Sequence, residues 1–197
     1  MGVEHRAEQI MSQAQFGKIV IFGVGLIGGS FSLALRRANA VREVVGFGRS
    51  AATLQQAREL GLIDRIGDDV AREVRDADLI LLATPVAQMA DILARIAPHL
   101  GANTLICDGG STKCDVVAAA RQQLGSKIAQ FVPAHPIAGA EQSGPAAARH
   151  QGPAGGTLYI FATRALASRH CGPLTSTLGR TQCPPLSLSS LWLVTAS

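Results

Sequence analysis

The sequence predicts an α/β fold, a doubly wound and mainly parallel sheet with helices on both faces. From residue 17 to about 135, apolar runs of strand length alternate with amphipathic stretches of helical length. Such alternation is typical of parallel strands joined by helical crossovers. The chain has 197 residues, of which 47% are hydrophobic and 16% charged. That is enough apolar material for one buried core and too little chain for two domains of typical size.

Each element has a local signal. Lys18 to Phe22 is a β-branched apolar run that ends in glycines, and an amphipathic stretch follows over Leu26 to Ala38. Ser50 is a good N-cap for the next helix. Further strands are expected at Val44–Phe47, Ile63–Ile66, Leu79–Ala83, Thr104–Cys107 and Gln130–Pro133. Further helices are expected at Ala51–Leu60, Asp69–Arg75, Val86–Ile96 and Thr112–Leu124.

The composition changes near residue 150. Residues 150–197 contain no Asp, Glu or Lys, and Ser, Thr, Pro and Gly interrupt any periodicity, although Thr157–Thr163 has the pattern of a short strand. We therefore expect a flexible leader over 1–16, a folded domain over 17–149 and an atypical Ser/Pro-rich tail over 150–197. Two interpretations of the tail stay open: a poorly ordered extension, or a reading frame that departs from the native protein near residue 150.

Charge and cysteine usage exclude several classes of protein. The formal net charge is +4, but residues 1–149 hold 15 Lys and Arg against 14 acidic residues, so no basic face is predicted and nucleic acid is not an expected partner. The four cysteines form no C-x-x-C pair, so neither a zinc site nor a disulfide framework is expected.

Targeting signals are not evident either. The longest apolar runs are strand-sized, well short of the roughly 20 residues of a membrane-spanning helix, and the first fifteen residues lack the apolar core of a signal peptide. No membrane association is expected, and a cytoplasmic location fits best.

A glycine motif follows the first strand. Gly23-x-Gly25-x-x-Gly28 would give a tight turn, a close backbone approach to a pyrophosphate and close packing of helix on strand. The amides at the helix start, including those of Leu26 and Ile27, would then face the anion. We therefore predict that 17–149 is an NAD(P)-binding, Rossmann-type domain; the alternative is a glycine-rich turn without a ligand.

The end of the second strand favours NADP over NAD. An NAD site usually has a carboxylate there for the ribose 2′-hydroxyl, whereas this chain has Gly48 followed by Arg49 and Ser50. A guanidinium and a hydroxyl suit a 2′-phosphate. Alternatively, Ser50 is only a helix cap and Arg49 a solvated side chain stacked on the adenine.

The fourth strand ends in Thr84-Pro85, at the edge where open sheets bind ligands. We predict that these two residues form a wall beside the nicotinamide. The alternative is that the proline simply starts a helix.

Two polar loops are expected at the same edge, DGGSTK at 108–113 and AHPIAGAEQSG at 134–144. Their convergence on a nicotinamide favours a dehydrogenase acting on a small molecule. Oxidising an alcohol requires a group that takes the hydroxyl proton, and His135 is suited to this by its near-neutral pKa as an amino-acid type.

In this order and spacing, GVGLIGGS, LLATPV, DGGSTK and HPIAGAEQSG resemble the prephenate and arogenate dehydrogenases of tyrosine biosynthesis over roughly residues 17–149. The resemblance implies an NAD(P)-dependent oxidative decarboxylation, with His135 and Ser111 catalytic and in contact with substrate, and Lys113 and Glu141 lining the substrate cleft. An alternative for Ser111 is a cap on the following helix.

The resemblance also implies a helical dimerisation domain, which 150–197 does not resemble. A homodimer is therefore expected of full-length family members, and little or no turnover of this chain. Two other functions stay open: a β-hydroxyacid-type dehydrogenase domain, or an NADP-binding module without chemistry.

Overall fold

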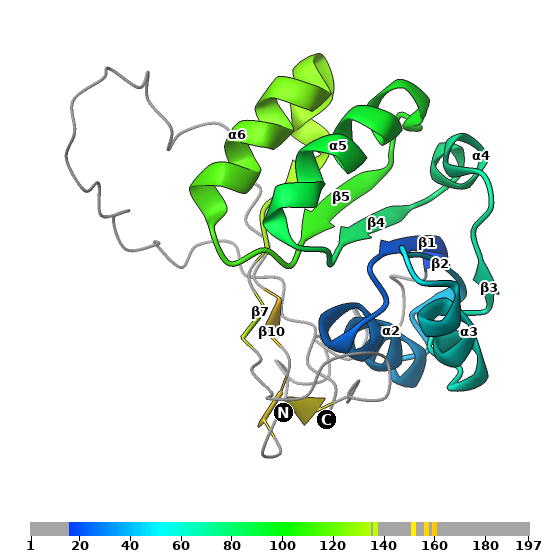
Figure 1. Cartoon of the computed structure of the whole chain (residues 1–197). Coiled ribbons are helices and arrows are strands. Elements are labelled where there is room, and N and C mark those ends of the chain that lie inside the picture. The colour runs from blue at the N-terminus through cyan, green and yellow to red at the C-terminus, as the bar shows by residue number, and fades with distance from the viewer. Residues whose placement is uncertain (1–15, 135, 138–150, 153–155, 158, 161–197) are drawn as a thin grey trace, which may run out of the picture.

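A computed structural model describes residues 16–134 throughout, and residues 136–137, 151–152, 156–157 and 159–160 as short strands. Its centre is a six-stranded parallel sheet of strand order β3-β2-β1-β4-β5-β6 (Figure 1). The order reverses between β1 and β4, as it does in doubly wound nucleotide-binding sheets. The predicted fold class is thereby confirmed.

The strands of this sheet are β1 (Phe16–Phe22), β2 (Val41–Phe47), β3 (Arg65–Ile66), β4 (Leu79–Leu82), β5 (Leu105–Asp108) and β6 (Phe131–Val132). The helices are α2 (Leu26–Arg37), α3 (Ala51–Glu59), α4 (Val70–Arg75), α5 (Val86–Ile96) and α6 (Lys113–Leu124), with 3-10 turns η1 (Ala97–His99) and η2 (Gly125–Gln130).

Strand boundaries differ most from the predictions at β2 and at the two edges. β2 begins at Val41, before the predicted start at Val44, because Phe16 extends β1 and pairs with Val41. The edge strands β3 and β6 are shorter than predicted, since each has only one neighbour and pairs with it at two positions. Gln130, predicted in a strand, instead ends η2.

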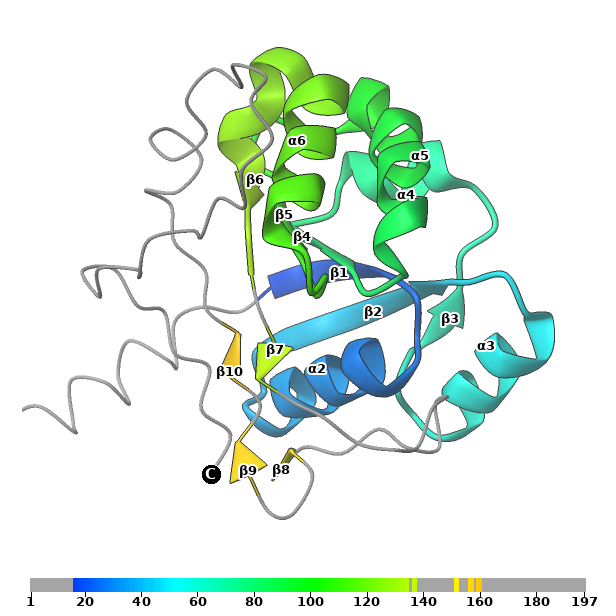
Figure 2. The ribbon, with the colours of Figure 1, turned by 60° about the vertical axis from the view of Figure 1, so that its left-hand side comes forward.

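Two apolar layers sandwich the sheet. Along β1, Val20 and Phe22 pack on the side covered by α4, α5 and α6, whereas Ile19 and Ile21 pack on the side covered by α2 and α3 (Figure 2). Ile19, Val20 and Ile21 are fully buried. Because successive strand residues face opposite sides, burial on both faces requires the continuous apolar runs that the sequence shows.

Four further strands pair beyond β6. β7 (Pro136–Ile137) pairs antiparallel with β10 (Tyr159–Ile160), and β8 (Gln151–Gly152) pairs antiparallel with β9 (Gly156–Thr157). Within the predicted strand Thr157–Thr163, residues 157, 159 and 160 are thus extended and paired, and the rest lies outside the described residues. The β7–β10 pair joins residues on the two sides of the boundary predicted at 149.

Three features of the described residues concern membrane spans, metal sites and cysteines. None of the helices there has the length and apolarity to cross a membrane. No cluster of His, Cys, Asp and Glu among these residues could hold a metal ion. Cys107 is a buried free thiol, Cys114 is exposed, and Cys171 and Cys183 lie outside the described residues.

Candidate nucleotide-binding site

The turn between β1 and α2 requires two of its glycines. Gly23 has a φ of +95°, and a Cβ there would lie 2.5 Å from the carbonyl oxygen of Ala83. A Cβ on Gly28 would lie 2.2 Å from the carbonyl oxygen of Gly23. Gly25 differs from both, because a Cβ there would meet nothing within 4 Å. Gly23 and Gly28 therefore serve the packing of the turn, whereas Gly25 faces open space.

Helix α2 begins at this open position. Its first backbone hydrogen bond runs from the amide of Gly29 to the carbonyl of Gly25, at 2.8 Å. The amides of Leu26, Ile27 and Gly28 precede this first helical donor, so they have no acceptor within the helix. Such amides, together with the positive end of the helix dipole, attract anions.

A cleft of about 780 Å³ opens beside this turn, at the carboxyl ends of β1, β2 and β4. Six of the predicted cofactor-binding residues line it: Gly23, Gly25, Arg49, Ser50, Thr84 and Pro85. Gly28, Leu26 and Ile27 were also predicted, but they are not among the lining residues. Leu26 and Ile27 can contribute amides at the helix start, and Gly28 is turned against the carbonyl of Gly23.

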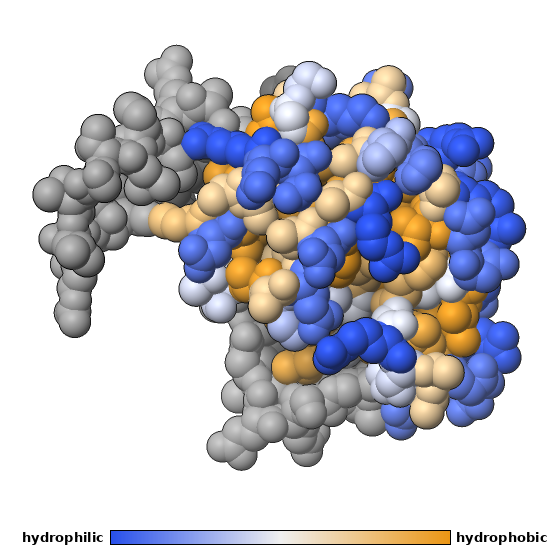
Figure 3. Space-filling model, turned by 45° about the horizontal axis from the view of Figure 1, so that its top comes forward, coloured by the Kyte–Doolittle hydropathy of each residue, from blue (hydrophilic) through white to orange (hydrophobic). Residues whose placement is uncertain are grey.

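Much of the lining is apolar. The rings of Phe22 and Phe47 stack with centroids 5.0 Å apart and planes 13° apart, and both line the cleft. On the face shown in Figure 3, apolar residues likewise reach the surface among hydrophilic ones. An apolar hollow with a few polar groups is typical of a site for a small molecule or cofactor.

Ser50, in the loop after β2, is a helix cap and also a residue of the cleft lining. Its Oγ accepts a hydrogen bond from the amide of Thr53 at 3.2 Å, so Ser50 caps α3. The same residue lines the cleft together with Gly48 and Arg49. The Arg49 side chain is exposed.

Thr84 and Pro85 also serve two purposes. Pro85 is the N-cap residue of α5, as the alternative interpretation proposed, and both residues line the cleft. The Thr84 hydroxyl oxygen is buried and has no hydrogen-bond partner among the described residues. A buried polar atom without a partner is uncommon in a folded protein, and this one belongs to a residue that lines the cleft.

Sequence reasoning missed one wall of the cleft. Gln88, Asp91, Ile92 and Arg95 follow one another along one face of α5, and all four line the cleft. Their spacing is the helical i, i+3, i+4, i+7 pattern, which was the signal available for finding them. The pattern does not by itself say that this face borders a ligand site.

The loops after β5 and β6 meet at a buried carboxylate. Asp108, the last residue of β5, is 1% exposed. Its Oδ2 accepts a hydrogen bond from the Gly110 amide at 2.8 Å and pairs with Lys113 Nζ, and its Oδ1 accepts from the Ala134 amide at 3.1 Å. Asp108 thus ties α6 and the chain after β6 to the end of β5. The sequence indicated the loop but not this role.

The predicted substrate-side residues are only partly described. Ser111 is exposed, and Thr112 is the N-cap residue of α6, so Ser111 does not cap that helix. The Lys113 ammonium is paired with Asp108. Neither residue lines the cleft. His135 and Glu141, the other two predicted substrate-side residues, lie outside the described residues.

Cys107, the residue before Asp108, is a thiol unsuited to nucleophilic chemistry. Cys107 is fully desolvated, and its burial, reinforced by the neighbouring Asp108 carboxylate, raises the thiol pKa to about 12. The thiolate is the nucleophilic form, so Cys107 is inert at neutral pH.

The comparison with known curated proteins agrees with this geometry. A cyclohexadienyl dehydrogenase of Zymomonas mobilis is 39% identical over 130 residues, which are 66% of this chain and 44% of that protein. A prephenate dehydrogenase of Bacillus subtilis is 41% identical over 133 residues, 66% of this chain and 35% of that protein. The chain therefore spans less than half the length of these relatives.

Solved structures are similar over the same part of the chain. The crystal structure of Aquifex aeolicus prephenate dehydrogenase with hydroxyphenyl propionate and NAD+ has a TM-score of 0.64 and 29% identity, covering 71% of this chain and 48% of that one. Arogenate dehydrogenase of Synechocystis has a TM-score of 0.59 and 31% identity, covering 67% of this chain and 45% of that one.

The family model for the prephenate dehydrogenase nucleotide-binding domain matches residues 31–160, which extends past the boundary predicted at 149. Together with the sheet order, the glycine turn and the cleft, this match shows that the chain belongs to the prephenate dehydrogenase family, through its nucleotide-binding domain.

Proposed function

We propose that the cleft holds a nicotinamide dinucleotide and that the chain is the nucleotide-binding part of an enzyme that oxidatively decarboxylates prephenate or arogenate. The observation that carries the proposal is the pairing of an open glycine position with a helix start. A Cβ on Gly25 would meet nothing within 4 Å, and the amides that follow it have no acceptor within the helix, because the first helical donor is the Gly29 amide. A pyrophosphate fits such a place by charge and by hydrogen bonding.

The chemistry of the remaining lining suits the same ligand. The apolar stack of Phe22 and Phe47 provides surface for an adenosine, and the partnerless Thr84 hydroxyl provides a polar contact. When bound, the nicotinamide would supply the hydride acceptor. Relatives support this choice, since the Aquifex aeolicus enzyme was solved with NAD+.

NADP is the preferred form of the cofactor in this proposal. The residue at the end of β2 that would hold a ribose hydroxyl in an NAD site is Gly48, with Arg49 and Ser50 following at the rim of the cleft. A carboxylate at this place would repel a 2′-phosphate, whereas a guanidinium attracts it.

In this proposal the loops after β5 and β6 carry the residues that accept the substrate proton and orient the substrate. His135 would hydrogen-bond the ring hydroxyl of the substrate and accept its proton as hydride leaves. Ser111 would orient that hydroxyl, and Lys113 and Glu141 would line the substrate cleft. Loss of carbon dioxide then follows from aromatisation, so the residues mainly need to align substrate and cofactor.

This chain is expected to bind cofactor with little or no turnover. Prephenate has two carboxylates, and the described parts of the loops after β5 and β6 contain no arginine that could hold them. In the family, a helical domain supplies basic residues and forms the homodimer. Partners of the complete enzyme would thus be a small-molecule substrate and a second subunit, acting in the cytoplasm.

A cofactor titration followed by substrate addition tests the proposal. The purified chain should bind NADP+ more tightly than NAD+, and adding prephenate or arogenate should produce little NADPH. Binding of neither dinucleotide would sink the proposal, and brisk NADPH formation would refute the expectation of little turnover.

One substitution tests the preference for NADP. Arg49→Asp should shift the ratio of the two dissociation constants towards NAD+, because it replaces a cation by a carboxylate at the proposed 2′-phosphate position. Isothermal titration calorimetry measures both constants. An unchanged ratio would contradict the role of Arg49.

A further inference from the structure

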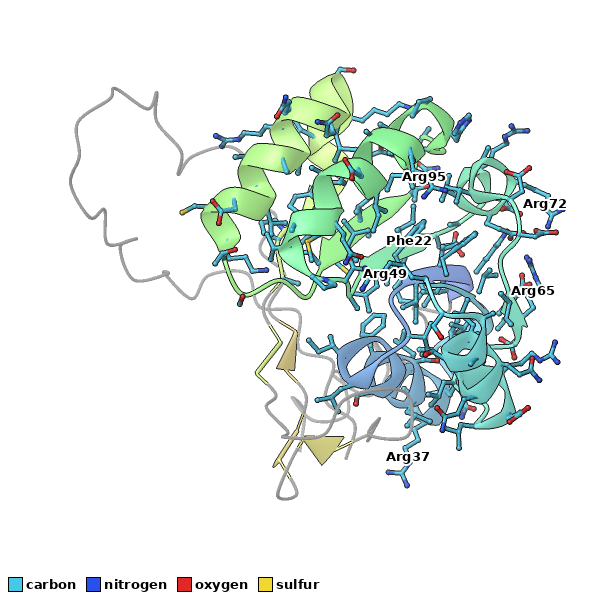
Figure 4. The ribbon with its side chains drawn as sticks, viewed as in Figure 1. Phe22, Arg37, Arg49, Arg65, Arg72 and Arg95 are labelled. Carbon is cyan, nitrogen blue, oxygen red and sulfur yellow. The ribbon has the colours of Figure 1, made fainter. Side chains whose placement is uncertain are left out.

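The cleft has few charged residues in its lining, and two of them are arginines from separate elements. Among the described lining residues only Arg49, Asp91 and Arg95 are charged. Arg49 comes from the loop between β2 and α3, and Arg95 comes from the last turn of α5. Figure 4 shows Arg49 and Arg95 with Phe22 in the region between α5 and α3, whereas Arg37 extends from the end of α2 away from it. Two guanidinium groups from separate elements thus border one hollow.

Neither of these arginines has a protein partner among the described residues, although other arginines do. Arg65 and Arg72 both pair with the buried carboxylate of Glu73. Asp91 precedes Arg95 by four residues on α5, a spacing that permits an ion pair, yet the structure holds none between them. The charge of Arg95 is therefore available to a ligand.

Arg95 also borders a second hollow, of about 650 Å³, next to the first. That hollow contains two carboxylates, but both are engaged. Asp68 pairs with Arg72, and Asp69 Oδ1 accepts hydrogen bonds from the Ala71 and Arg72 amides at 2.9 and 3.3 Å. Arg95 therefore stands where the two hollows join, and no acidic partner there competes for it.

A phosphate monoester is the ligand group that such an arrangement recognises. Guanidinium groups bind phosphate oxygens through paired, charge-assisted hydrogen bonds. The Ser50 hydroxyl lies on the same rim as Arg49, and the single carboxylate of Asp91 leaves the charged lining with a net positive charge. In a dinucleotide, the group that is present in NADP and absent from NAD is one such monoester, the ribose 2′-phosphate.

We propose that Arg95 is a second determinant of NADP specificity, contacting the ribose 2′-phosphate from α5 while Arg49 contacts it from the loop after β2. The inference rests on the proposed dinucleotide site. Asp91 opposes the same phosphate and moderates the preference. Two separate elements, the loop after β2 and helix α5, then set the preference for NADP over NAD. The sequence of the loop after β2 is not sufficient to predict that preference.

The test measures dissociation constants of the chain for NADP+ and NAD+ by calorimetry, in the wild type and in Arg95→Ala, Arg49→Ala, the double variant and Asp91→Asn. Arg95→Ala should weaken NADP+ binding by about 10- to 100-fold, the size expected for one charge-assisted hydrogen-bonding group, and change NAD+ binding by less than about twofold. Asp91→Asn should strengthen NADP+ binding, and added salt should reduce each difference.

Arg37→Ala is the matched control, since it removes an exposed arginine that lies away from the cleft. It should leave both dissociation constants unchanged, and circular dichroism should show every variant folded. A parallel competition between 2′-AMP and 5′-AMP reports the phosphate position directly, because Arg95→Ala should weaken only the first.

The outcomes separate this inference from the proposed function. If Arg49→Ala lowers NADP+ affinity and Arg95→Ala does not, the inference is overturned while the dinucleotide site stands. Equal loss of NADP+ and NAD+ in Arg95→Ala would also overturn it, because the contact would then be to a part that both cofactors share. If the wild type binds neither cofactor, the inference fails together with the proposed function.

Discussion

Two polar regions of this domain differ in whether their charged groups have partners within the protein. Around Glu73 on α4, three cations converge on one fully buried carboxylate: Lys18, Arg65 and Arg72. In the cleft, Arg49, Arg95 and the Thr84 hydroxyl have no such partners among the described residues. In the first region the charged groups are paired with one another, and we expect these pairs to stabilise the fold. The second leaves polar groups without protein partners, as the proposed binding site requires and a structural ion cluster does not.

The largest expected effect on stability comes from removing Glu73, the centre of the ion cluster on α4. Glu73→Ala should lower the free energy of unfolding by about 3 to 5 kcal/mol, because it leaves three cations around an empty buried position. Urea denaturation measures this, with Glu59→Ala on the exposed face of α3 as the control. Equal, small losses in both variants would show that the Glu73 cluster adds nothing beyond surface charge.

The same cluster predicts how stability depends on pH. Hydrogen bonding by Arg65, followed by that of Lys18 and Arg72, holds the pKa of Glu73 well below its usual range despite its burial. A carboxyl with a lowered folded-state pKa contributes stability above its unfolded pKa, about 4.3, and loses it as pH falls below that value. Tm should therefore begin to drop below about pH 5 and continue to drop until the lowered folded-state pKa is reached, and it should drop less steeply in Glu73→Gln. Parallel curves for the two proteins would contradict this.

A smaller loss of stability is expected at the loops near the proposed substrate side. Asp108→Asn should cost about 2 to 3 kcal/mol, because it removes the charge that pairs with Lys113 and changes an acceptor of two backbone amides. Asp115→Asn, at an exposed site on the first turn of α6, should cost much less. Thermal unfolding compares them, and similar values would contradict the tie through Asp108.

The smallest change in stability, and the sharpest contrast, is expected from two glycines of one turn. Gly28→Ala should destabilise by about 1 to 3 kcal/mol, since its Cβ would overlap the Gly23 carbonyl. Gly25→Ala should leave Tm unchanged, because its φ of −101° suits any residue and its Cβ would face open space.

Gly25→Ala, which should not affect stability, is expected to affect dinucleotide binding. Gly25→Ala should weaken dinucleotide binding by about tenfold or more, as the methyl group enters the space proposed for the pyrophosphate. If the calorimetric dissociation constants stay at the wild-type value, the proposed pyrophosphate position is wrong.

Local signals account for most of the fold. The alternation of apolar runs and amphipathic stretches predicted the strands and helices of residues 16–134 in their correct order, and Ser50 was correctly identified as a cap. The edges of the sheet were predicted less well. A strand such as β3 ends where its only neighbour stops pairing with it, and no residue within the strand encodes that point.

The residues of the candidate site likewise divide into those that the sequence predicted and those that it did not. The glycine spacing predicted which residues surround the turn, and six of the predicted cofactor residues line the cleft. Arg95 was missed, because its contribution depends on how α5 is rotated against the sheet. Asp108 was missed as a tie between loops, because the Ala134 amide that it accepts lies 26 residues further along the chain.

The sequence by itself determined what is local: the period of each element, the turn that only glycine can form and the Ser50 cap of α3. Only the tertiary structure decided which charges are satisfied. Glu73 and Asp91 are both acidic residues on helices, and nothing in the chain around them tells a buried carboxylate with three cationic partners from one at the rim of an open cleft. Burial and partnership are properties of segments brought together by folding, so they appear only once the packing is known.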